Sequence, residues 1–191
     1  MMRIITGRAR GVKLRSLEGE QTRPTAERAK EAVFSMLQFE IEDRKVLDLF
    51  AGSGQLGLEA VSRGAASAVL VDRSRDAIEI IKKNCLKTKL APFCDVICSD
   101  YAEFLRGCRG KRKFDMVFLD PPYALEVIPD AIDRMLRAGV IEEGCTLVCE
   151  AADFQHVFGG NETLANRFEV LREARYGVAC VTVMRLKGAE E

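Results

Sequence analysis

The sequence predicts an α/β fold: a doubly wound, mostly parallel seven-stranded sheet that ends in an antiparallel hairpin and is preceded by an N-terminal β-hairpin and helix. From Lys45 onward, short apolar runs alternate with helical segments, which is the pattern of parallel strands joined by covering helices. The run at residues 116–119 has no polar residue, as expected of a strand covered on both faces. The last two runs are separated only by a turn near Tyr176-Gly177, which favours antiparallel pairing.

The N-terminal extension has its own pattern. Residues 3–17 predict two short strands around a basic tip between Gly7 and Gly11. Thr25 is placed to cap a helix that runs to about Gln38. That helix has one apolar stripe, formed by Ala29, Val33 and Leu37.

The core is expected to follow without a break. Its strands are expected at residues 46–49, 67–71, 94–98, 116–119, 146–149, 168–174 and 179–186. Its helices are expected at residues 55–63, 76–90 and 101–106, with one more that ends at about residue 137. A length of 191 residues suits one domain. We therefore expect a single domain over 1–191, made of the extension 1–40 and a catalytic core 41–191.

The composition is that of a globular protein, with 48% hydrophobic and 30% charged residues. No apolar stretch is long enough to span a bilayer, and the first residues lack the apolar centre of a signal peptide, so we expect a cytoplasmic protein. The seven cysteines are expected to be reduced and packed as small hydrophobic residues. Because the chain has one histidine, His156, and no paired CxxC motifs, we expect no metal site.

The net charge is zero, but basic residues gather in two places. Residues 1–15 hold five of them and no acid, and residues 104–114 also hold five and no acid. Two local basic patches on a neutral protein indicate a polyanion bound at defined places. Two solvated loops would explain them equally well.

The segment from Asp48 to Gly57, DLFAGSGQLG, joins the first core strand to its helix. Its glycines let the backbone turn tightly and approach a ligand, and Gly57 permits close packing of the helix on the strand. By spacing alone, the three glycines also match the fingerprint of dinucleotide-binding proteins. The loop therefore predicts a nucleotide-like cofactor without identifying it.

Acids at the carboxyl ends of three strands favour S-adenosylmethionine over NAD. Asp48 would repel the pyrophosphate of NAD but suits the cationic amino-acid end of S-adenosylmethionine. Asp72 can accept hydrogen bonds from the ribose hydroxyls, as in NAD proteins, and Asp100 can reach the adenine amino group or serve only as a helix N-cap. The expected cofactor-binding residues are Asp48, Phe50, Ala51, Gly52, Ser53, Gly54, Asp72, Arg73, Asp100 and Tyr101.

The most specific element is Asp120-Pro121-Pro122-Tyr123, directly after the apolar strand. Consecutive prolines fix φ and donate no backbone hydrogen bond, so they hold a rigid, extended loop. The Asp120 carboxylate and the Pro121 carbonyl could then hold both N–H bonds of a planar amino group and stabilise the charge that develops on its nitrogen. Tyr123 supplies a ring for an extruded base to stack on. We expect all four residues to be catalytic.

This tetrad resembles the signature of amino-methyltransferases that act on adenine, guanine or glutamine amides. The N-terminal residues narrow the match, and so do the glycine loop, residues 62–65 and Glu150. The N-terminal motifs are Arg3-Ile4-Ile5-x-Gly7-x-x-Arg10-Gly11-x-x-Leu14 and Thr22-Arg23-Pro24-Thr25-x-x-Arg28-x-x-Glu31-Ala32-x-Phe34. The chain thus resembles the RsmD family of bacterial small-subunit ribosomal RNA guanine-N2 methyltransferases, from about residue 2 to 150 and more weakly in the final hairpin.

The resemblance implies a Rossmann-like methyltransferase sheet, S-adenosylmethionine as methyl donor, and the exocyclic N2 of a guanine in small-subunit ribosomal RNA as acceptor. The implied partner is ribosomal RNA in an assembling small subunit, with no metal, membrane or oligomer implied. Arg23 and Thr25 are expected near the cofactor or target base, or else only as a turn and cap. The expected RNA-binding residues are Arg3, Arg8, Arg10, Lys13, Arg15 and Arg23.

Two departures from the family pattern concern the loops. Gln55 stands where the family is expected to have a small residue, so contacts near the cofactor are expected to change. Val178-Ala179 replaces a more polar pair after the Tyr176-Gly177 turn, which puts RNA contacts there in question.

Several alternatives stay open at this stage. An adenine-N6 enzyme acting on DNA or RNA shares the tetrad, although a DNA enzyme usually needs a separate target-recognition region for which 191 residues leave little room. A glutamine-modifying enzyme would more often begin its tetrad with Asn. An NAD-dependent oxidoreductase is disfavoured by Asp48 and the tetrad, and a non-catalytic RNA-binding assembly factor by the intact tetrad.

Overall fold

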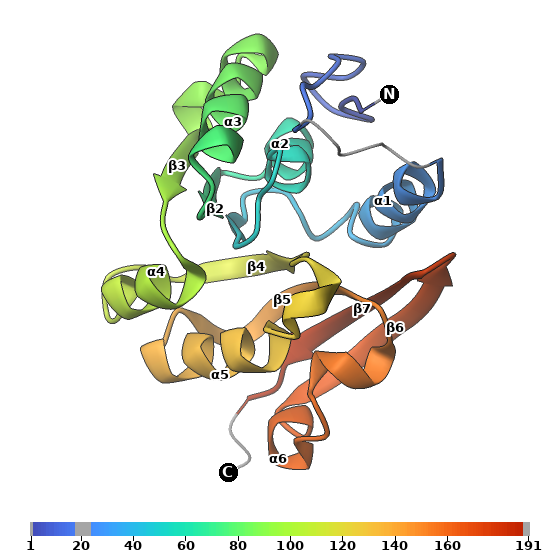
Figure 1. Cartoon of the computed structure of the whole chain (residues 1–191), viewed down its shortest axis with the longest axis vertical. Helices are drawn as coiled ribbons and strands as arrows, with labels where there is room; N and C mark the ends of the chain where they lie inside the picture. Colours follow the sequence, from blue (N-terminus) through green and yellow to red (C-terminus); the bar gives the residue numbers. More distant parts are fainter. Residues whose placement is uncertain (1, 18–23, 189–191) are drawn as a thin grey trace.

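The computed structural model describes residues 2–17 and 24–188, and its centre is a seven-stranded sheet in the order β3-β2-β1-β4-β5-β7-β6 (Figure 1). The first five strands run parallel, whereas β7 pairs antiparallel with both β5 and β6. The strands are β1 (Lys45–Asp48), β2 (Ser67–Asp72), β3 (Cys94–Cys98), β4 (Phe114–Leu119), β5 (Ile141–Ala151), β6 (Phe168–Tyr176) and β7 (Ala179–Leu186). The predicted mostly parallel sheet with a closing hairpin is confirmed.

Helices cover both faces of the sheet, with α1 to α3 on one side and α4 to α6 on the other (Figure 1). They are α1 (Pro24–Met36), α2 (Gln55–Ser62), α3 (Arg75–Thr88), α4 (Tyr101–Cys108), α5 (Ile128–Ala138) and α6 (Glu162–Ala165). Short 3-10 turns, η1 (Ala91–Phe93), η2 (Tyr123–Leu125) and η3 (Phe154–Val157), complete the connections. Alternate residues of β1 enter opposite cores, Val46 on the α2 side and Leu47 on the α5 side, as the pleat of a strand requires.

The strand order reverses between β1 and β4, which lie side by side in the middle of the sheet. Open α/β sheets bind their ligands at such a reversal, beyond the carboxyl ends of the strands. Asp48 ends β1, Asp72 ends β2, and Asp120 follows β4. The topology therefore brings the predicted acids to one edge of the sheet.

The N-terminal segment folds back on itself as predicted, but with less strand structure. One antiparallel bridge joins Arg3 and Lys13, and Ile4 N–H donates to the carbonyl of Val12 at 3.0 Å, yet neither arm is a regular strand. The segment pairs with no strand of the main sheet and instead packs against α2 and α3, so no neighbouring strand extends its pairing. The predicted pair of short strands is therefore wrong in extent.

A buried carboxylate ties this segment to the core. Glu59 of α2 has no exposed surface, and its oxygens accept the backbone N–H groups of Ile5 at 2.8 Å and Thr6 at 3.0 Å. The same carboxylate lies 3.3 Å from the Lys30 ammonium of α1 and 2.8 Å from Arg63 Nε. Asp or Glu is rarely buried unless paired, and here two cations and two backbone donors satisfy it.

A second anchor is Asn84 of α3, which is also fully buried. Its amide group exchanges hydrogen bonds with both the N–H and the carbonyl of Arg15, at 2.8 and 3.0 Å. Its Nδ2 also donates to the carbonyl of Ser53 in the glycine loop at 2.9 Å. One side chain thus joins the end of the N-terminal segment to the loop that follows β1.

Differences from the expected elements have physical reasons. Helix α1 begins at Pro24, so Thr25 lies inside its first turn and not at the cap. The predicted stripe of Ala29, Val33 and Leu37 is buried, although the helix ends at Met36 and Leu37 lies just beyond it. Strand β5 extends beyond the expected 146–149 at both ends, because Ile141 pairs with Phe114 of β4 ahead of an irregular stretch that holds Glu142 and Glu143, and residues up to Ala151 pair with β7. Helix α6 was not predicted, since its single turn is set by the Asn161 side chain, which accepts the Leu164 N–H at 2.9 Å.

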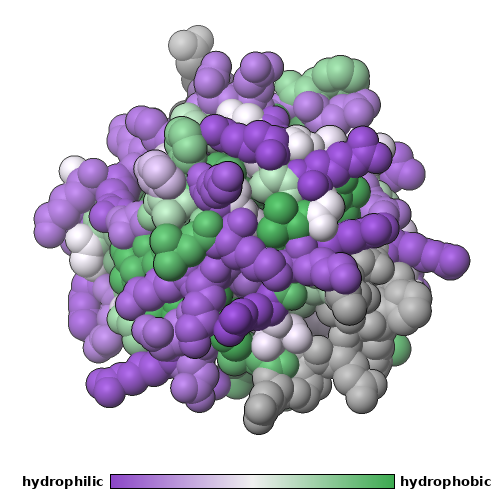
Figure 2. Space-filling model, turned by 90° about the horizontal axis from the view of Figure 1, so that it is seen from above, coloured by the Kyte–Doolittle hydropathy of each residue, from purple (hydrophilic) through white to green (hydrophobic). Residues whose placement is uncertain are grey.

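The face seen from above is mostly hydrophilic where the structure describes it, with apolar side chains in small groups (Figure 2). Within the described ranges, no helix is long and apolar enough to cross a membrane, and no three potential metal ligands come together. All seven cysteines are free thiols, and five are buried, as expected of small hydrophobic side chains. His156 lies half-exposed in η3, 3.8 Å from Glu126.

Candidate active site

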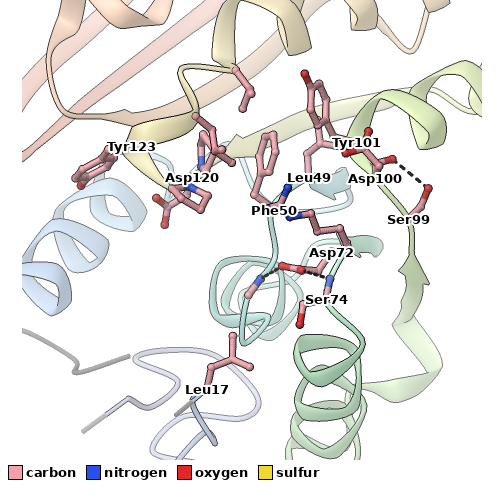
Figure 3. Close-up of a pocket in the computed structure, with 16 residues that line it drawn as sticks. Leu17, Leu49, Phe50, Asp72, Ser74, Ser99, Asp100, Tyr101, Asp120 and Tyr123 are labelled. Carbon is pink, nitrogen blue, oxygen red and sulfur yellow. Dashed lines mark hydrogen bonds between the residues drawn. The ribbon is translucent and has the colours of Figure 1, made fainter. Parts of the chain in front are cut away.

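A cavity of about 570 Å³ opens beyond the carboxyl ends of β1, β2, β3 and β4, at the reversal of strand order (Figure 3). Ten of the predicted site residues line it, and they come from four separate connections of the sheet. These ten are Phe50, Gly52, Asp72, Arg73, Asp100, Tyr101, Asp120, Pro121, Pro122 and Tyr123. The sheet therefore joins most of the predicted cofactor-binding residues and the tetrad in a single site.

Asp72 and Asp100 are both held by backbone groups. The Asp72 oxygens accept N–H from Gly52 at 2.9 Å and from Ser74 at 2.8 Å, which fixes the carboxylate across the glycine loop (Figure 3). Asp100 caps α4, with Oδ1 accepting the Ala102 N–H at 2.8 Å. A carboxylate has about four acceptor positions, so each keeps capacity for a ligand while it is positioned. Asp100 is thus both the helix cap and a wall of the cavity, two roles that the sequence presented as alternatives.

Aromatic rings form the wall beside Asp100. The rings of Phe50 and Tyr101 lie 5.4 Å apart between centroids, and the Tyr101 hydroxyl donates to Asp130 Oδ2 at 2.7 Å. Burial and this hydrogen bond raise the pKa of Tyr101 to about 12. The hydroxyl therefore stays protonated and neutral at physiological pH. An apolar wall with a carboxylate at its rim fits a planar heterocycle that carries an amino group.

The glycine loop lies behind the cavity more than inside it. Gly52 and Gly54 have positive φ angles of 53° and 79°, and a Cβ on Gly57 would stand 2.5 Å from Leu70 Cδ2. The helix therefore approaches β2 as closely as predicted. Of the expected loop contacts, Ala51, Ser53 and Gly54 do not line the cavity. The Ser53 hydroxyl instead donates to Met2 Sδ at 3.0 Å.

Asp48 is buried beneath this loop, with 1% of its surface exposed, and does not line the cavity. Its Oδ2 accepts the Gly57 N–H at 3.0 Å, whereas Oδ1 has no hydrogen-bond partner in the described structure. Burial raises the pKa of Asp48 to about 7, with Asp72 adding to the increase and the Gly57 hydrogen bond opposing it. An unpartnered buried acceptor beside the cavity fits a cationic group arriving with a cofactor.

The pH dependence of stability should report this buried acid. The pKa of Asp48 is raised from 3.8 to about 7 by folding, so its contribution is present at low pH and is lost as pH rises through about 7. Relative to Asp48→Asn, the wild-type protein should lose roughly 3 to 4 kcal/mol of unfolding free energy between pH 4 and pH 8. Urea unfolding at both pH values, without cofactor, measures this difference.

The matched control is Asp133→Asn, which removes an exposed carboxylate on α5. This variant should follow the wild-type pH profile. Coincident profiles for wild type and Asp48→Asn would contradict the buried, protonated state of Asp48.

The tetrad leaves β4 at the edge of the cavity. Asp120, Pro121 and Pro122 all line it, and the Pro122 carbonyl is engaged in η2, where it accepts the Leu125 N–H at 3.0 Å. The Tyr123 hydroxyl donates to Glu150 Oε1 at 2.6 Å. Burial and the Glu150 carboxylate raise the pKa of Tyr123 well above its usual range. The residue as a whole is 36% exposed, which leaves part of it accessible from outside.

A second, smaller cavity of about 60 Å³ lies between α1, α2 and the sheet. Asp120 lines both cavities, so the tetrad forms part of the wall between them. The other polar side chains of the second cavity are Lys30, Gln55 and Glu150. Gln55 does not line the large cavity, so the expectation that it changes contacts near the cofactor is not supported by its position.

The basic residues of the N-terminal segment divide into two groups. All five described residues, Arg3, Arg8, Arg10, Lys13 and Arg15, are exposed, in agreement with a surface role, but Arg8 also has a structural one. The Arg8 guanidinium donates from Nε and Nη2 to the Val61 carbonyl, at 3.2 and 3.1 Å, and stacks 4.2 Å above the Phe93 ring. Arg8 thus caps the carboxyl end of α2, so its contacts are mainly structural. Arg23 lies outside the described residues.

The second basic patch is largely neutralised. Arg106 pairs with Glu103, Arg112 with Asp95, and Lys113 with Glu142. These acids lie outside residues 104–114, on distant strands or in the preceding helical turn. The charges of that segment alone therefore did not reveal the ion pairs. Of the two interpretations of this patch, a solvated, ion-paired surface fits the structure better.

Sequence reasoning missed several apolar walls of the large cavity. Leu17, Leu49, Leu125 and Val127 line it, together with Ser74 and Ser99. Leu17 enters from the N-terminal segment, far from the other residues in sequence (Figure 3). No local pattern marks an apolar loop residue as a ligand contact, whereas Ser99 directly precedes an acid that was recognised.

Comparison with known proteins finds relatives whose names specify ribosomal RNA methylation. The family model described as "Conserved hypothetical protein 95" matches residues 2–185 of the chain. YlbH of Bacillus subtilis (strain 168), whose name assigns it provisionally to the rRNA methyltransferases, is 33% identical over 98% of this chain and 100% of its own length. A protein of Haemophilus influenzae named Ribosomal RNA small subunit methyltransferase D is 39% identical over 78% of each chain.

A solved structure extends the likeness to three dimensions. The Escherichia coli protein yhhF, described provisionally as a methyltransferase, superposes with a TM-score of 0.83 at 30% identity. The match covers 98% of each chain. The N-terminal segment and the final hairpin are therefore included along with the central sheet.

Proposed function

The chain belongs to the RsmD family, and from this premise we propose that it transfers the methyl group of S-adenosylmethionine to the exocyclic N2 of a guanine in small-subunit ribosomal RNA. One observation carries the proposal. Asp120 and Pro121 of the tetrad line the same cavity as Asp72 and Asp100, the acids suited to a nucleoside. The residues that would hold an amine therefore border the same cavity as those that would hold the methyl donor.

The residues of the large cavity fit S-adenosylmethionine by their chemistry. Asp72 would accept the ribose hydroxyls, and Asp100 would accept the adenine amino group beside the Phe50 and Tyr101 rings. The unpartnered Oδ1 of Asp48 offers an acceptor behind the glycine loop for the cationic end of the cofactor, whose charge would favour the ionised carboxylate. When bound, S-adenosylmethionine supplies an electrophilic methyl group on a positively charged sulfur.

The tetrad would prepare the acceptor. The lone pair of an exocyclic amine is delocalised into the ring, which makes the nitrogen a poor nucleophile. The Asp120 carboxylate and the Pro121 carbonyl would accept its two N–H bonds and turn the nitrogen toward the methyl group. Both acceptors also stabilise the positive charge that develops on nitrogen during transfer. Asp120 can take the proton released at the end.

The acceptor class follows from the relatives, two of which have names that specify ribosomal RNA methylation. We further propose an assembling small subunit as the substrate, which would place the enzyme in the cytoplasm, and a single functional unit over residues 1–191. An adenine-N6 reaction remains the second candidate because the tetrad would hold either amine. A methyltransferase acting on guanine N2 is favoured by the family.

Labelled S-adenosylmethionine tests the function directly. The protein is incubated with small ribosomal particles from a strain that lacks it, and the methylated nucleotide is mapped by mass spectrometry. The expected product is N2-methylguanine at one position. Label on an adenine would support the second candidate, and no transfer to naked or assembled RNA would overturn the proposal.

RNA affinity should depend on the exposed basic residues of the N-terminal segment. Replacing Arg10 and Lys13 together by glutamine should weaken RNA binding and lower the slope of log K against log salt by about 1 to 2, because two phosphate contacts are lost. Binding measured over a range of salt concentrations gives the slope. Arg106→Gln with Lys111→Gln, in the second basic patch, is the matched control and should leave the slope unchanged.

A further inference from the structure

The second cavity has the chemistry of a base edge rather than of a cofactor. It lies on the far side of Asp120 from Asp72 and Asp100, and it combines carboxylates with nitrogen donors. Asp120 and Glu150 offer acceptors and the Gln55 amide offers N–H donors, while the Lys30 ammonium is held by the Arg3 carbonyl and Glu59. At about 60 Å³ the cavity is too small for a whole purine but has room for atoms along one side of it.

The Watson–Crick edge of guanine presents a matching order of groups. Its N2 amino group and N1–H are adjacent donors, and O6 beyond them is an acceptor. Adenine presents a donor amine beside N1, which is an acceptor. A second carboxylate next to the one that holds the amine therefore suits guanine, whereas against adenine it would leave two acceptors facing each other.

We propose that the second cavity receives the N1 and O6 positions of the acceptor guanine while its N2 amine stays at Asp120 on the side of the large cavity, with Glu150 accepting N1–H and with the Gln55 amide donating to O6. Glu150 is then the residue that selects guanine. The inference rests on the proposed function and adds the groups that read the base. The purine ring itself stays outside the cavity, next to the accessible part of the Tyr123 ring.

The contact between Tyr123 and Glu150 supports this arrangement. The Tyr123 hydroxyl donates to Oε1 of Glu150 at 2.6 Å, which fixes the carboxylate with respect to the tetrad. The other oxygen, Oε2, is not needed for that contact and can accept N1–H. A single hydrogen bond thus positions both the stacking ring, in η2 after β4, and the carboxylate that reads the base, near the end of the neighbouring parallel strand β5.

Base substitution at the mapped position provides the test. Particles are reconstituted with guanine or with 2-aminopurine, which keeps the N2 amine but has an acceptor at N1 and no O6. We expect the wild-type enzyme to prefer guanine by about 100-fold or more in kcat/KM, because a site built for a donor rejects its absence. Glu150→Gln, whose amide can donate to N1, should lower activity on guanine and reduce the preference to below about 10-fold.

Two further variants distinguish recognition of the base by Glu150 from positioning of Glu150 by Tyr123. Tyr123→Phe removes only the hydroxyl, so kcat/KM should fall on both bases while the preference for guanine stays. Glu169→Gln, the same change on the exposed strand β6, should match the wild type in both measurements. Thermal unfolding of each variant shows whether it folds.

The outcomes distinguish failure of the proposed function from failure of the proposed role of Glu150. A wild-type enzyme that methylates no RNA overturns the proposed function itself. A wild-type enzyme that methylates guanine, with Glu150→Gln retaining the full preference, overturns the role of Glu150 while the function stands. If Tyr123→Phe reduces the preference as much as Glu150→Gln does, Glu150 acts only through the tyrosine and the inference is also overturned.

Discussion

Replacing Asp120 with alanine is expected to lower kcat for methyl transfer by about 10³-fold while the protein stays folded. The variant removes an acceptor that both orients the amine and stabilises its developing charge, and losing one such preorganised group costs on the order of 10²- to 10³-fold. The loss of the proton acceptor adds to this. Single-turnover transfer to unmodified small-subunit particles measures the rate, and calorimetry measures cofactor affinity.

Asp120→Asn distinguishes the two roles of the carboxylate. The amide keeps a carbonyl oxygen in the same position, so orientation of the amine survives while the negative charge is lost. If orientation dominates, this variant should stay within about 30-fold of the wild type. Full activity in Asp120→Ala on the same particles would refute the mechanism, since no other described side chain of the tetrad carries a carboxylate.

Glu59→Gln is expected to destabilise the protein by about 3 to 5 kcal/mol, the usual cost of breaking a buried charge pair. The amide turns one acceptor into a donor, which then faces the Ile5 and Thr6 N–H groups or the cations of Lys30 and Arg63. For a domain of this length, the midpoint of thermal unfolding should fall by on the order of 10 °C. Urea and thermal unfolding measure the change.

Glu79→Gln is the appropriate comparison because it makes the same chemical change on α3. That side chain is 61% exposed and pairs only with Lys82, so its loss should cost less than about 0.5 kcal/mol. Equal destabilisation by the two substitutions would show that burial of Glu59 is not the cause.

Most of the fold could be predicted from the sequence, because the strand segments differ sharply in composition from the segments around them. Strands β3 and β7 have the predicted bounds, since β3 lies between η1 and the helix cap Asp100, and β7 begins directly after the turn at residues 177–178. The first half of β5 could not be predicted from Glu142, Glu143 and Gly144, because these residues form an irregular stretch between two points of pairing with β4, and Gly144 has a positive φ of 80°. The folded-back N-terminal segment was predicted, but not its attachment through the polar residues Glu59 and Asn84.

Site residues could be predicted where an acidic side chain stands at the carboxyl end of a strand. Asp72 ends a strand, Asp100 and Asp120 follow one, and parallel strands bring such positions to one edge. Asp48 follows the same rule but lies under the loop, because whether a side chain points over or beneath a glycine turn depends on three-dimensional packing. The second cavity joins Lys30 and Glu150, which are far apart in sequence and share no local pattern.

Glu59 and Asn84 also bear on how the gene can be shortened. A chain beginning at residue 41 would keep every strand of the sheet, yet its interior would contain a carboxylate without the Lys30 ammonium and an amide without the Arg15 backbone. It would also lose Lys30 and Leu17 from the walls of the two cavities. By these contacts the N-terminal segment belongs to the interior of the protein as much as the central strands do. Removing it would therefore remove part of the folded core.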